Sequence, residues 1–253
     1  MKNVIDLNGK KILVTGASSG MGAETAVLCS QLGATVILVA RREEKLQEVK
    51  GKLEGDGHRC YPFDLSKVDE IEEFMKGMIE ETGPLDGFVH SAGISSSRPL
   101  KMMKPNVLRE VMDINFNSFV EIVRCIMKRG CFNSGLSIVG ISSISSTLGN
   151  QAKTAYCASK AAMDAVVRCF AKELAPVGVR ANTVCPGMID TDIYTKFKAN
   201  AGDSYDAKMR MDRQYLGLGQ PIDVANMIVF LLSSASRLIT GSNIGVDGGM
   251  LSS

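Results

Sequence analysis

Apolar, β-branched runs alternate along the chain with stretches of helical period. The strand-like segments are 11–16, 35–40, 59–63, 87–91, 137–142, 180–184 and 243–246. Runs such as Ile12-Leu13-Val14 and Val36-Ile37-Leu38-Val39 are continuously apolar. This pattern is typical of a strand that is covered on both faces of a parallel sheet.

Helical patterns separate these strands. They lie near 21–32, 43–54, 68–81, 107–129, 154–175 and 223–233. The repeated order of strand, helix and strand predicts an α/β protein: a doubly wound Rossmann fold with about seven parallel strands and helices on both faces. Because no repeat or linker-like stretch interrupts the order, residues 1–253 are predicted to form one dinucleotide-binding and catalytic domain.

Residues 192–220 break this rhythm. The segment is polar, contains Gly202, and carries Tyr194 and Tyr205. A connection of this length between a strand and a helix is typical of a substrate loop, although a plain surface excursion fits the pattern as well. Residues after Gly93 and around 145–150 are also expected to contribute to specificity. Apolar contact is favoured by Met188, Tyr194, Met209 and Met211, whereas an anion is favoured by Arg98, Lys196, Lys198 and Arg210, so the sequence does not assign the substrate.

Composition and charge exclude several classes of protein. The 253 residues include 29 basic and 27 acidic side chains, a net charge of +2, with 45% hydrophobic residues. This balance gives no broad positive field for nucleic acid. No apolar run approaches the roughly 20 residues of a membrane span. The first residues lack the apolar stretch of a signal peptide, so we expect a cytoplasmic protein without nucleic-acid or membrane partners.

Metal-binding and hydrolase patterns are also missing. The seven cysteines include no C-x-x-C pair, which indicates neither a disulfide framework nor a zinc site. A Ser-His-Asp hydrolase would have to use His58 or His90, because these are the two histidines of the chain. We therefore predict no metal.

A glycine-rich turn follows the first strand. It reads Thr15-Gly16-Ala17-Ser18-Ser19-Gly20-Met21-Gly22 and opens the first helix. Glycines allow backbone N–H groups to approach a pyrophosphate at a helix N-terminus. The spacing is G-x-x-x-G-x-G, which predicts a nucleotide loop at this position rather than a plain turn.

From this loop onward the sequence resembles the classical short-chain dehydrogenase/reductase family. The family's T-G-x-x-x-G-x-G loop is followed here, at matching spacings, by His90-Ser91-Ala92-Gly93, Asn115, Ser143, Tyr156-Cys157-Ala158-Ser159-Lys160, Pro186-Gly187 and Gly241–Gly249. The resemblance covers nearly the whole chain. One departure is that the usual N-N-A-G reads His90-Ser91-Ala92-Gly93, which alters the support that the asparagines give.

The resemblance implies the residues that bind a nicotinamide dinucleotide. Asp64 and Leu65 are similar to the family's adenine contact, and Ala92 and Gly93 to the turn beside the cofactor. The segment that closes over the nicotinamide is implied to include Pro186, Gly187, Ile189 and Thr191. The predicted pyrophosphate contacts are Gly16, Ser18, Ser19, Gly20, Met21 and Gly22.

Arg41 and Arg42 follow the second strand, where an enzyme that prefers NAD places an acidic residue. An arginine binds a 2′-phosphate through paired charge-assisted hydrogen bonds. Cations in the first turn of a helix oppose its dipole, so plain surface arginines explain the pattern less well. We predict NADP(H) as the favoured cofactor, with NAD(H) possible.

The resemblance implies a catalytic set of Asn115, Ser143, Tyr156 and Lys160. Tyr156 and Lys160 are four residues apart and share a helix face. We expect the ammonium to lower the pKa of the phenol, so that Tyr156 acts as acid or base. Ser143, thirteen residues before Tyr156, would bind the substrate oxygen, and Ser142 is its neighbour. Lys160 would also hold the ribose, and Asn115 a relay water.

These features predict an NADP(H)-dependent oxidoreductase that interconverts a carbonyl and a secondary alcohol. The alternatives are a 3-oxoacyl-thioester (acyl-carrier-protein) reductase, with Lys128 and Arg129 as docking cations, and an NAD-dependent alcohol, sugar or steroid dehydrogenase. A sensor or scaffold without turnover usually lacks the tyrosine or the lysine. The helices 107–129 and 154–175 are predicted to pair subunits in a homotetramer or homodimer.

Overall fold

The structure is a computed structural model that describes residues 5–192, 194–195 and 212–252. Its strands form one parallel, seven-stranded sheet in the order β3-β2-β1-β4-β5-β6-β7. The strands are β1 (Lys11–Thr15), β2 (Thr35–Ala40), β3 (Arg59–Pro62), β4 (Leu85–His90), β5 (Phe132–Ile141), β6 (Arg180–Pro186) and β7 (Asn243–Val246). The predicted doubly wound Rossmann fold is confirmed.

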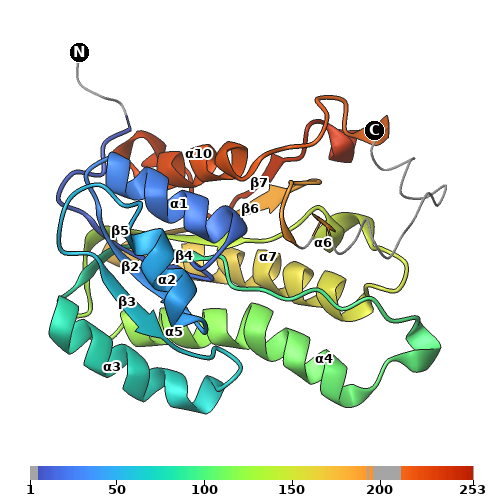
Figure 1. Ribbon diagram of the computed structural model, residues 1–253, viewed down its shortest axis with the longest axis horizontal. Coiled ribbons are helices and arrows are strands. Elements are labelled where there is room, and N and C mark those ends of the chain that lie inside the picture. The colour runs from blue at the N-terminus through green and yellow to red at the C-terminus, as the bar shows by residue number, and fades with distance from the viewer. Residues whose placement is uncertain (1–4, 193, 196–211, 253) are drawn as a thin grey trace.

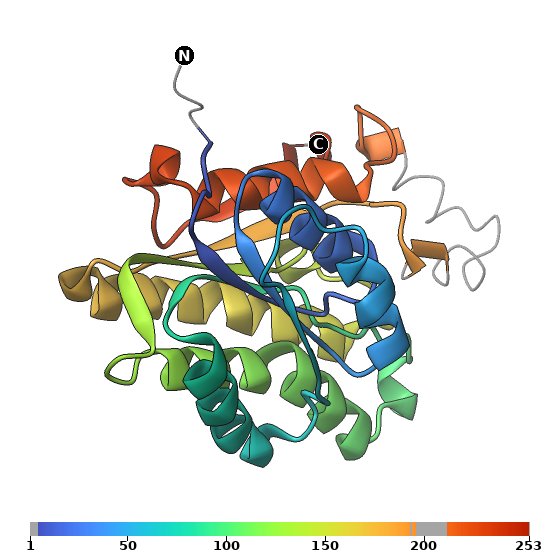
Figure 2. The ribbon, with the colours of Figure 1, turned by 60° about the vertical axis from the view of Figure 1, so that its left-hand side comes forward.

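Helices cover both faces of the sheet, as Figures 1 and 2 show. The helices are α1 (Gly20–Gln31), α2 (Glu43–Lys50), α3 (Ile71–Thr82), α4 (Pro105–Met112), α5 (Ser118–Ile126), α6 (Ser145–Leu148), α7 (Thr154–Leu174) and α10 (Pro221–Leu232). One layer contains α1, α2 and α10, and the opposite layer contains α3, α5 and α7.

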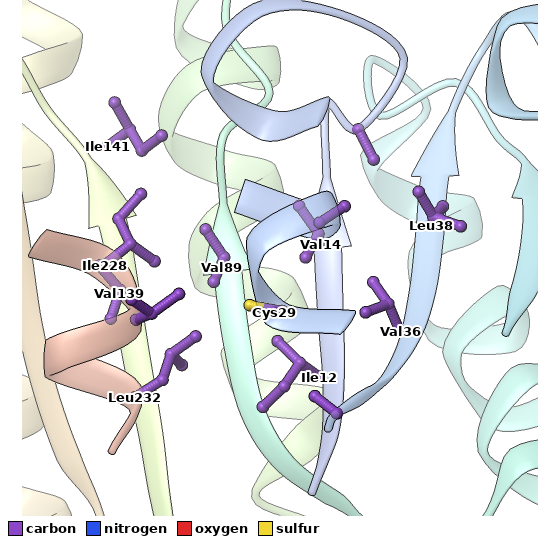
Figure 3. Packing of buried hydrophobic residues seen from close by; sticks show 14 of the residues in the cluster. Ile12, Val14, Cys29, Val36, Leu38, Val89, Val139, Ile141, Ile228 and Leu232 are labelled. Carbon is purple, nitrogen blue, oxygen red and sulfur yellow. The ribbon is translucent and has the colours of Figure 1, made fainter. Parts of the chain in front are cut away.

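The two layers bury alternate residues of the same strands. In β1, Ile12 and Val14 pack toward α1 and α10, whereas Leu13 packs toward α3 and α5. Figure 3 shows the first of these cores, in which Val14 and Val89 of the sheet lie close to Cys29 of α1. Because both faces of each central strand are covered, the strands read in sequence as continuous apolar runs.

The predicted helix 107–129 is interrupted. A π-helical segment, Asp113–Asn117, separates α4 from α5, and α5 already ends at Ile126. The Ser118 hydroxyl donates to the Ile114 carbonyl (2.8 Å), while the Asn115 side chain bonds outside the helix. Since π segments often occur at functional sites, this interruption indicates that a functional site lies near Asn115.

The strand order reverses between β1 and β4, which lie side by side at the centre of the sheet. Thr15 pairs with His90 in register, and the Ser91 N–H donates to the Thr15 carbonyl (3.2 Å). Ligands of doubly wound sheets bind at such a switch point, beyond the carboxyl ends of the strands. The glycine-rich turn and the segment after β4 leave the sheet here.

The predicted substrate loop 192–220 is described in part. Its last portion returns to the domain, because Ile189 and Gly219 form a parallel bridge and the Gly219 N–H donates to Met188 (3.0 Å). Residues 196–211 lie outside the described part, and with them Lys196, Lys198, Gly202, Tyr205, Met209, Arg210 and Met211. In the described part of the chain, we find no helix with the length and apolar character that a membrane crossing needs.

Candidate active site

The glycine-rich turn is packed too closely for side chains. Gly16 has a φ of +67°, and a Cβ there would lie 2.6 Å from the backbone nitrogen of Ala92. A Cβ on Gly22 would lie 2.5 Å from the Gly16 carbonyl oxygen. Glycine at both positions therefore lets the loop fold tightly between β1, α1 and the segment after β4.

The N-terminus of α1 presents uncapped backbone N–H groups at this loop. The N-cap residue, Ser19, makes no side-chain hydrogen bond to the first turn, and no acidic residue stands in that turn. A Cβ on Gly20 would meet the Thr191 methyl group at 3.5 Å, so Thr191 lies over the same loop. Uncapped donors at the positive end of a helix fit a pyrophosphate.

Arg42 reaches back over the glycine-rich turn. Its Nη2 donates to the Ser18 hydroxyl (3.3 Å) and to that of Ser19 (3.5 Å). Arg41 beside it is exposed, and both residues directly precede α2. A guanidinium at this place adds positive charge next to the predicted pyrophosphate contacts.

The other expected cofactor contacts lie around the same edge of the sheet. One Asp64 oxygen accepts from the N–H (3.0 Å) and the hydroxyl (2.9 Å) of Ser66, so Asp64 also shapes a turn. Leu65 is buried in the core, and Ala92 packs against that core. A Cβ on Gly93 would lie 3.5 Å from the Lys160 Nζ, which places the Gly93 backbone beside two members of the predicted catalytic set, Lys160 and Asn115.

Ser143 and Tyr156 line one cleft, together with Ser142, Pro186, Gly187, Met188, Ile189 and Thr191. The Ser143 hydroxyl accepts from the Ser145 N–H (3.1 Å), and its interaction with the Tyr156 phenol lowers the pKa of that group. The Ser142 hydroxyl donates instead to the Lys160 backbone carbonyl (3.3 Å). The two neighbouring serines thus differ: the Ser142 hydroxyl is bonded to the backbone of α7, whereas Ser143 acts on the pKa of Tyr156.

The expected effect of Lys160 on the phenol is not found. Desolvation raises the pKa of Tyr156, and the Ser143 hydrogen bond opposes that rise. Burial also lowers the pKa of Lys160, to about 8. The Lys160 Nζ lies 5.9 Å from the Tyr156 ring centroid and donates to the Ile141 carbonyl (2.6 Å). Burial therefore decides the direction of both shifts, and the pKa of Tyr156 is raised rather than lowered in this structure.

Asn115 is fully buried in the π-helical segment and acts as a clamp. Its Oδ1 accepts from the Ile94 N–H (2.8 Å), and its Nδ2 donates to the Ile94 carbonyl (3.0 Å) and the Ser159 hydroxyl (2.9 Å). These bonds tie the segment after β4 to α7. The side chain satisfies a helix irregularity and at the same time lies next to Gly93, near Lys160.

Sequence reasoning missed Gln214, which braces the segment over the cleft. Its carboxamide accepts from the Met188 N–H (2.7 Å) and donates to the carbonyls of Met188 (3.0 Å) and Gly217 (2.5 Å). A Cβ on Gly187 would lie 2.5 Å from the Gln214 Oε1, so glycine makes room for this brace. Only the folded loop brings Gln214 to Met188, and no sequence pattern marks the pair.

Lys153 was also missed, although its spacing offered a signal. It stands three residues before Tyr156, one helical turn along the chain, and lines the same cleft. Its Nζ donates to the Ser95 hydroxyl (2.8 Å). Within the described residues, no group of three or more His, Cys, Asp or Glu side chains is arranged to hold a metal ion.

Comparisons with known proteins agree with this geometry. The family model described as enoyl-(acyl carrier protein) reductase matches residues 16–251. The chain is 33% identical over 247 residues to the 3-oxoacyl-(acyl-carrier-protein) reductase of Thermotoga maritima, covering 97% of this chain and 99% of the relative.

Two solved structures are similar over nearly the whole chain. A short-chain type dehydrogenase/reductase from Mycobacterium ulcerans has a TM-score of 0.87 at 32% identity, covering 97% of this chain and 91% of that one. A protein proposed to be an NAD(P)-dependent gluconate 5-dehydrogenase from Beutenbergia cavernae, solved with NADP, has a TM-score of 0.90 at 28% identity, covering 99% and 100%.

Proposed function

Since this chain belongs to the short-chain dehydrogenase/reductase family of oxidoreductases, we propose that it uses NADP(H) to interconvert a carbonyl and a secondary alcohol. The observation that carries the proposal is the cleft that Ser143 and Tyr156 line together, with the buried Lys160 beside the Tyr156 ring. We also propose that the enzyme assembles as a homotetramer or a homodimer.

The site fits a dinucleotide. Glycine at 16 and 22 lets the loop fold tightly against the segment after β4, and the uncapped N-terminus of α1 presents donors at this loop. Arg42, which already bridges Ser18 and Ser19, would bind the 2′-phosphate, and Arg41 beside it would add charge. Asp64 would accept from the adenine. When bound, the nicotinamide supplies or accepts the hydride.

The residues of this chain handle the proton and the charge on oxygen. Tyr156 donates its proton to the substrate oxygen as the carbonyl is reduced, and takes it back in the reverse reaction. Ser143 donates to the same oxygen and orients it. The proton lost by Tyr156 is replaced through Lys160, which is mostly protonated at neutral pH because its pKa is about 8. Asn115 fixes the Ile94 backbone beside them.

The cofactor preference is tested by fluorescence titration with NADPH and NADH at low and high salt. We expect tighter NADPH binding that weakens with salt. In Arg42→Ala, the Kd for NADPH should rise about 10- to 100-fold, because a charge-assisted hydrogen bond contributes about 1.5–3 kcal/mol. The Kd for NADH should change by less than about threefold, since NADH has no 2′-phosphate for the guanidinium to bind.

Lys45→Ala is the matched control, because Lys45 lies in α2, is exposed and pairs with Glu48 instead of the loop. It should leave both dissociation constants near those of the parent. If Arg42→Ala weakened the binding of NADPH and NADH equally, or if the parent protein bound NADH more tightly than NADPH, Arg42 would not be the residue that binds the 2′-phosphate. Either result would favour the NAD-dependent alternative.

A second candidate is reduction of a 3-oxoacyl thioester, which the name of the Thermotoga relative favours. The docking cation expected at Lys128 is already engaged by Glu72, which also pairs with Arg124. The test is NADPH oxidation with an acetoacetyl thioester. We expect slow turnover or none, and turnover faster than with small ketones would make this candidate the better one.

A further inference from the structure

Two polar side chains, those of Ser145 and Asn150, line the cleft beside Ser143 and are not used by the proposed mechanism. The Asn150 Nδ2 donates to the Ser145 hydroxyl at 2.6 Å. Ser145 begins α6 and is 8% exposed, whereas residues 147–149 between the two are exposed. The exposed turn therefore holds its two ends, and both of these side chains, at the cleft.

Backbone contacts fix both residues in place. The Ser145 N–H donates to the Ser143 hydroxyl oxygen (3.1 Å), which ties the pair to the predicted catalytic serine. The Asn150 N–H donates to the Cys157 sulfur (3.3 Å), and the Asn150 carbonyl accepts from the Lys153 N–H (3.0 Å), so Asn150 is fixed to the start of α7. A pair that is held in this way is preorganised for a ligand, because little side-chain freedom is lost on binding.

The pair leaves one donor and one acceptor unused. A serine hydroxyl donates one hydrogen bond, and a carboxamide oxygen accepts up to two. Among the described residues, no acceptor takes the Ser145 hydroxyl proton, and no donor reaches the Asn150 Oδ1. A buried hydroxyl proton without an acceptor costs free energy. A ligand group that supplies an acceptor to Ser145 and a donor to Asn150 would therefore be favoured.

A hydroxyl group of the ligand matches this arrangement, because it accepts one hydrogen bond and donates another. A carboxylate or a phosphate accepts from Ser145 but places a second oxygen acceptor against the Asn150 Oδ1. An alkyl chain satisfies neither group. The described residues that cover the cleft, Met188 and Ile189, are apolar and do not compete for these bonds.

We infer that Ser145 and Asn150 bind a hydroxyl group of the substrate, so that the enzyme acts on hydroxy ketones and on the diols that correspond to them. The inference rests on the proposed function, because it concerns the substrate of the same Tyr156 site. Since the Ser145 N–H contacts the Ser143 oxygen, the bound hydroxyl lies close to the reacting carbonyl, on the next carbon or the one after it. Ketones and thioesters without such a hydroxyl lose both contacts.

Matched pairs of ketones test the inference. We would measure oxidation of NADPH, or of NADH if it binds more tightly, with 1-hydroxy-2-butanone against 1-methoxy-2-butanone and with 4-hydroxy-2-butanone against 4-methoxy-2-butanone. The methyl ether keeps the oxygen but has no proton to donate to Asn150. For at least one pair, kcat/KM should be more than about tenfold higher for the hydroxy ketone. A smaller ratio in both pairs would overturn the inference. The smaller ketone 2-butanone should be as poor as the ethers, which shows that the added methyl group is not the cause.

Variants assign the preference to the pair. Ser145→Ala keeps the N–H that contacts Ser143 and removes the hydroxyl. It should lower kcat/KM for the hydroxy ketone about tenfold and leave that for the methyl ether within about threefold. Asn150→Ala, which removes the acceptor, should have the same selective effect. Thr147→Ala, at an exposed position of the same turn, is the matched control and should behave like the parent.

Two results would contradict this assignment. One is a preference for the hydroxy ketone that survives both Ser145→Ala and Asn150→Ala. The other is an equal loss of kcat/KM with the hydroxy ketone and its methyl ether, which would show that the pair only supports the shape of the cleft.

Binding separates this inference from the proposed function. If no ketone is turned over with either cofactor, the proposed function fails, and saturation-transfer NMR of the two hydroxy ketones with the protein then decides the inference. Binding that is lost in Ser145→Ala and kept in Thr147→Ala would support a hydroxyl site in the absence of turnover. Absence of binding to the parent protein, or equal binding by the two variants, would overturn it.

Discussion

Replacing Tyr156 with phenylalanine is expected to lower kcat about a thousandfold while the Kd for NADPH stays within about twofold. The substitution removes one hydroxyl, the group that gives its proton to the substrate oxygen, and a positioned general acid contributes about 10²- to 10⁴-fold. The phenyl ring still fills the cleft beside Lys160. Steady-state rates and a cofactor titration on the same preparation measure the two effects separately.

The neighbouring serines provide a matched pair for this experiment. Ser143→Ala should lower kcat about 100-fold, because it removes the donor that orients the substrate oxygen. Ser142→Ala should have an effect of less than about threefold, because the Ser142 hydroxyl is turned to the Lys160 backbone. Full activity of Tyr156→Phe would refute the proposed mechanism. A larger loss of kcat in Ser142→Ala than in Ser143→Ala would show that Ser143 is not the donor to the substrate oxygen.

The sequence predicted the sheet well because both of its faces are buried. Apolar runs such as that of β2 identify such strands, and short connections leave few possible orders for them. The tight glycine-rich turn was equally predictable from the sequence, since glycine is required where a Cβ on Gly16 or Gly22 would meet backbone at 2.5 to 2.6 Å. In the sheet, burial on both faces requires apolar residues, and in the turn, the lack of room for a Cβ requires glycine.

Features that depend on contacts between distant segments were not predictable. The apolar spacing of 107–129 continues through the π-helical segment, so periodicity hides the interruption that turns Asn115 toward Ile94. The brace from Gln214 to Met188 depends on how the loop returns to the sheet. The pKa of Tyr156 depends on burial, which spacing along a helix does not report.

His90, where the family usually has asparagine, is expected to make the fold sensitive to acid. It is fully buried between Phe88 and Phe119, and its Nδ1 lies 3.0 Å from the Thr15 hydroxyl. Among the described residues, its Nε2 has no hydrogen-bond partner. Burial, and then the charge of Lys160, lower the pKa of His90 to about 3. The imidazole is therefore neutral in the folded protein.

The direction of the pH effect follows from that lowered pKa. An unfolded histidine has a pKa of about 6.5, so below this pH the unfolded chain binds a proton that folded His90 does not. The stabilisation is fully present above pH 6.5 and is lost as the pH falls toward 3. The loss approaches about 1.4 kcal/mol per pH unit, or about 2 kcal/mol between pH 8 and pH 5. Urea unfolding at several pH values measures it.

His90→Asn should be less stable at pH 8, because asparagine does not fill the space between the two phenylalanines, but its stability should fall less steeply below pH 6.5. Phe119→Leu is the control, since it loosens packing against the same ring and keeps the imidazole. It should retain the steep acid slope of the parent. If His90→Asn and the parent have equal slopes, His90 binds its proton as readily in the fold as in the unfolded chain, and the expected acid sensitivity is refuted.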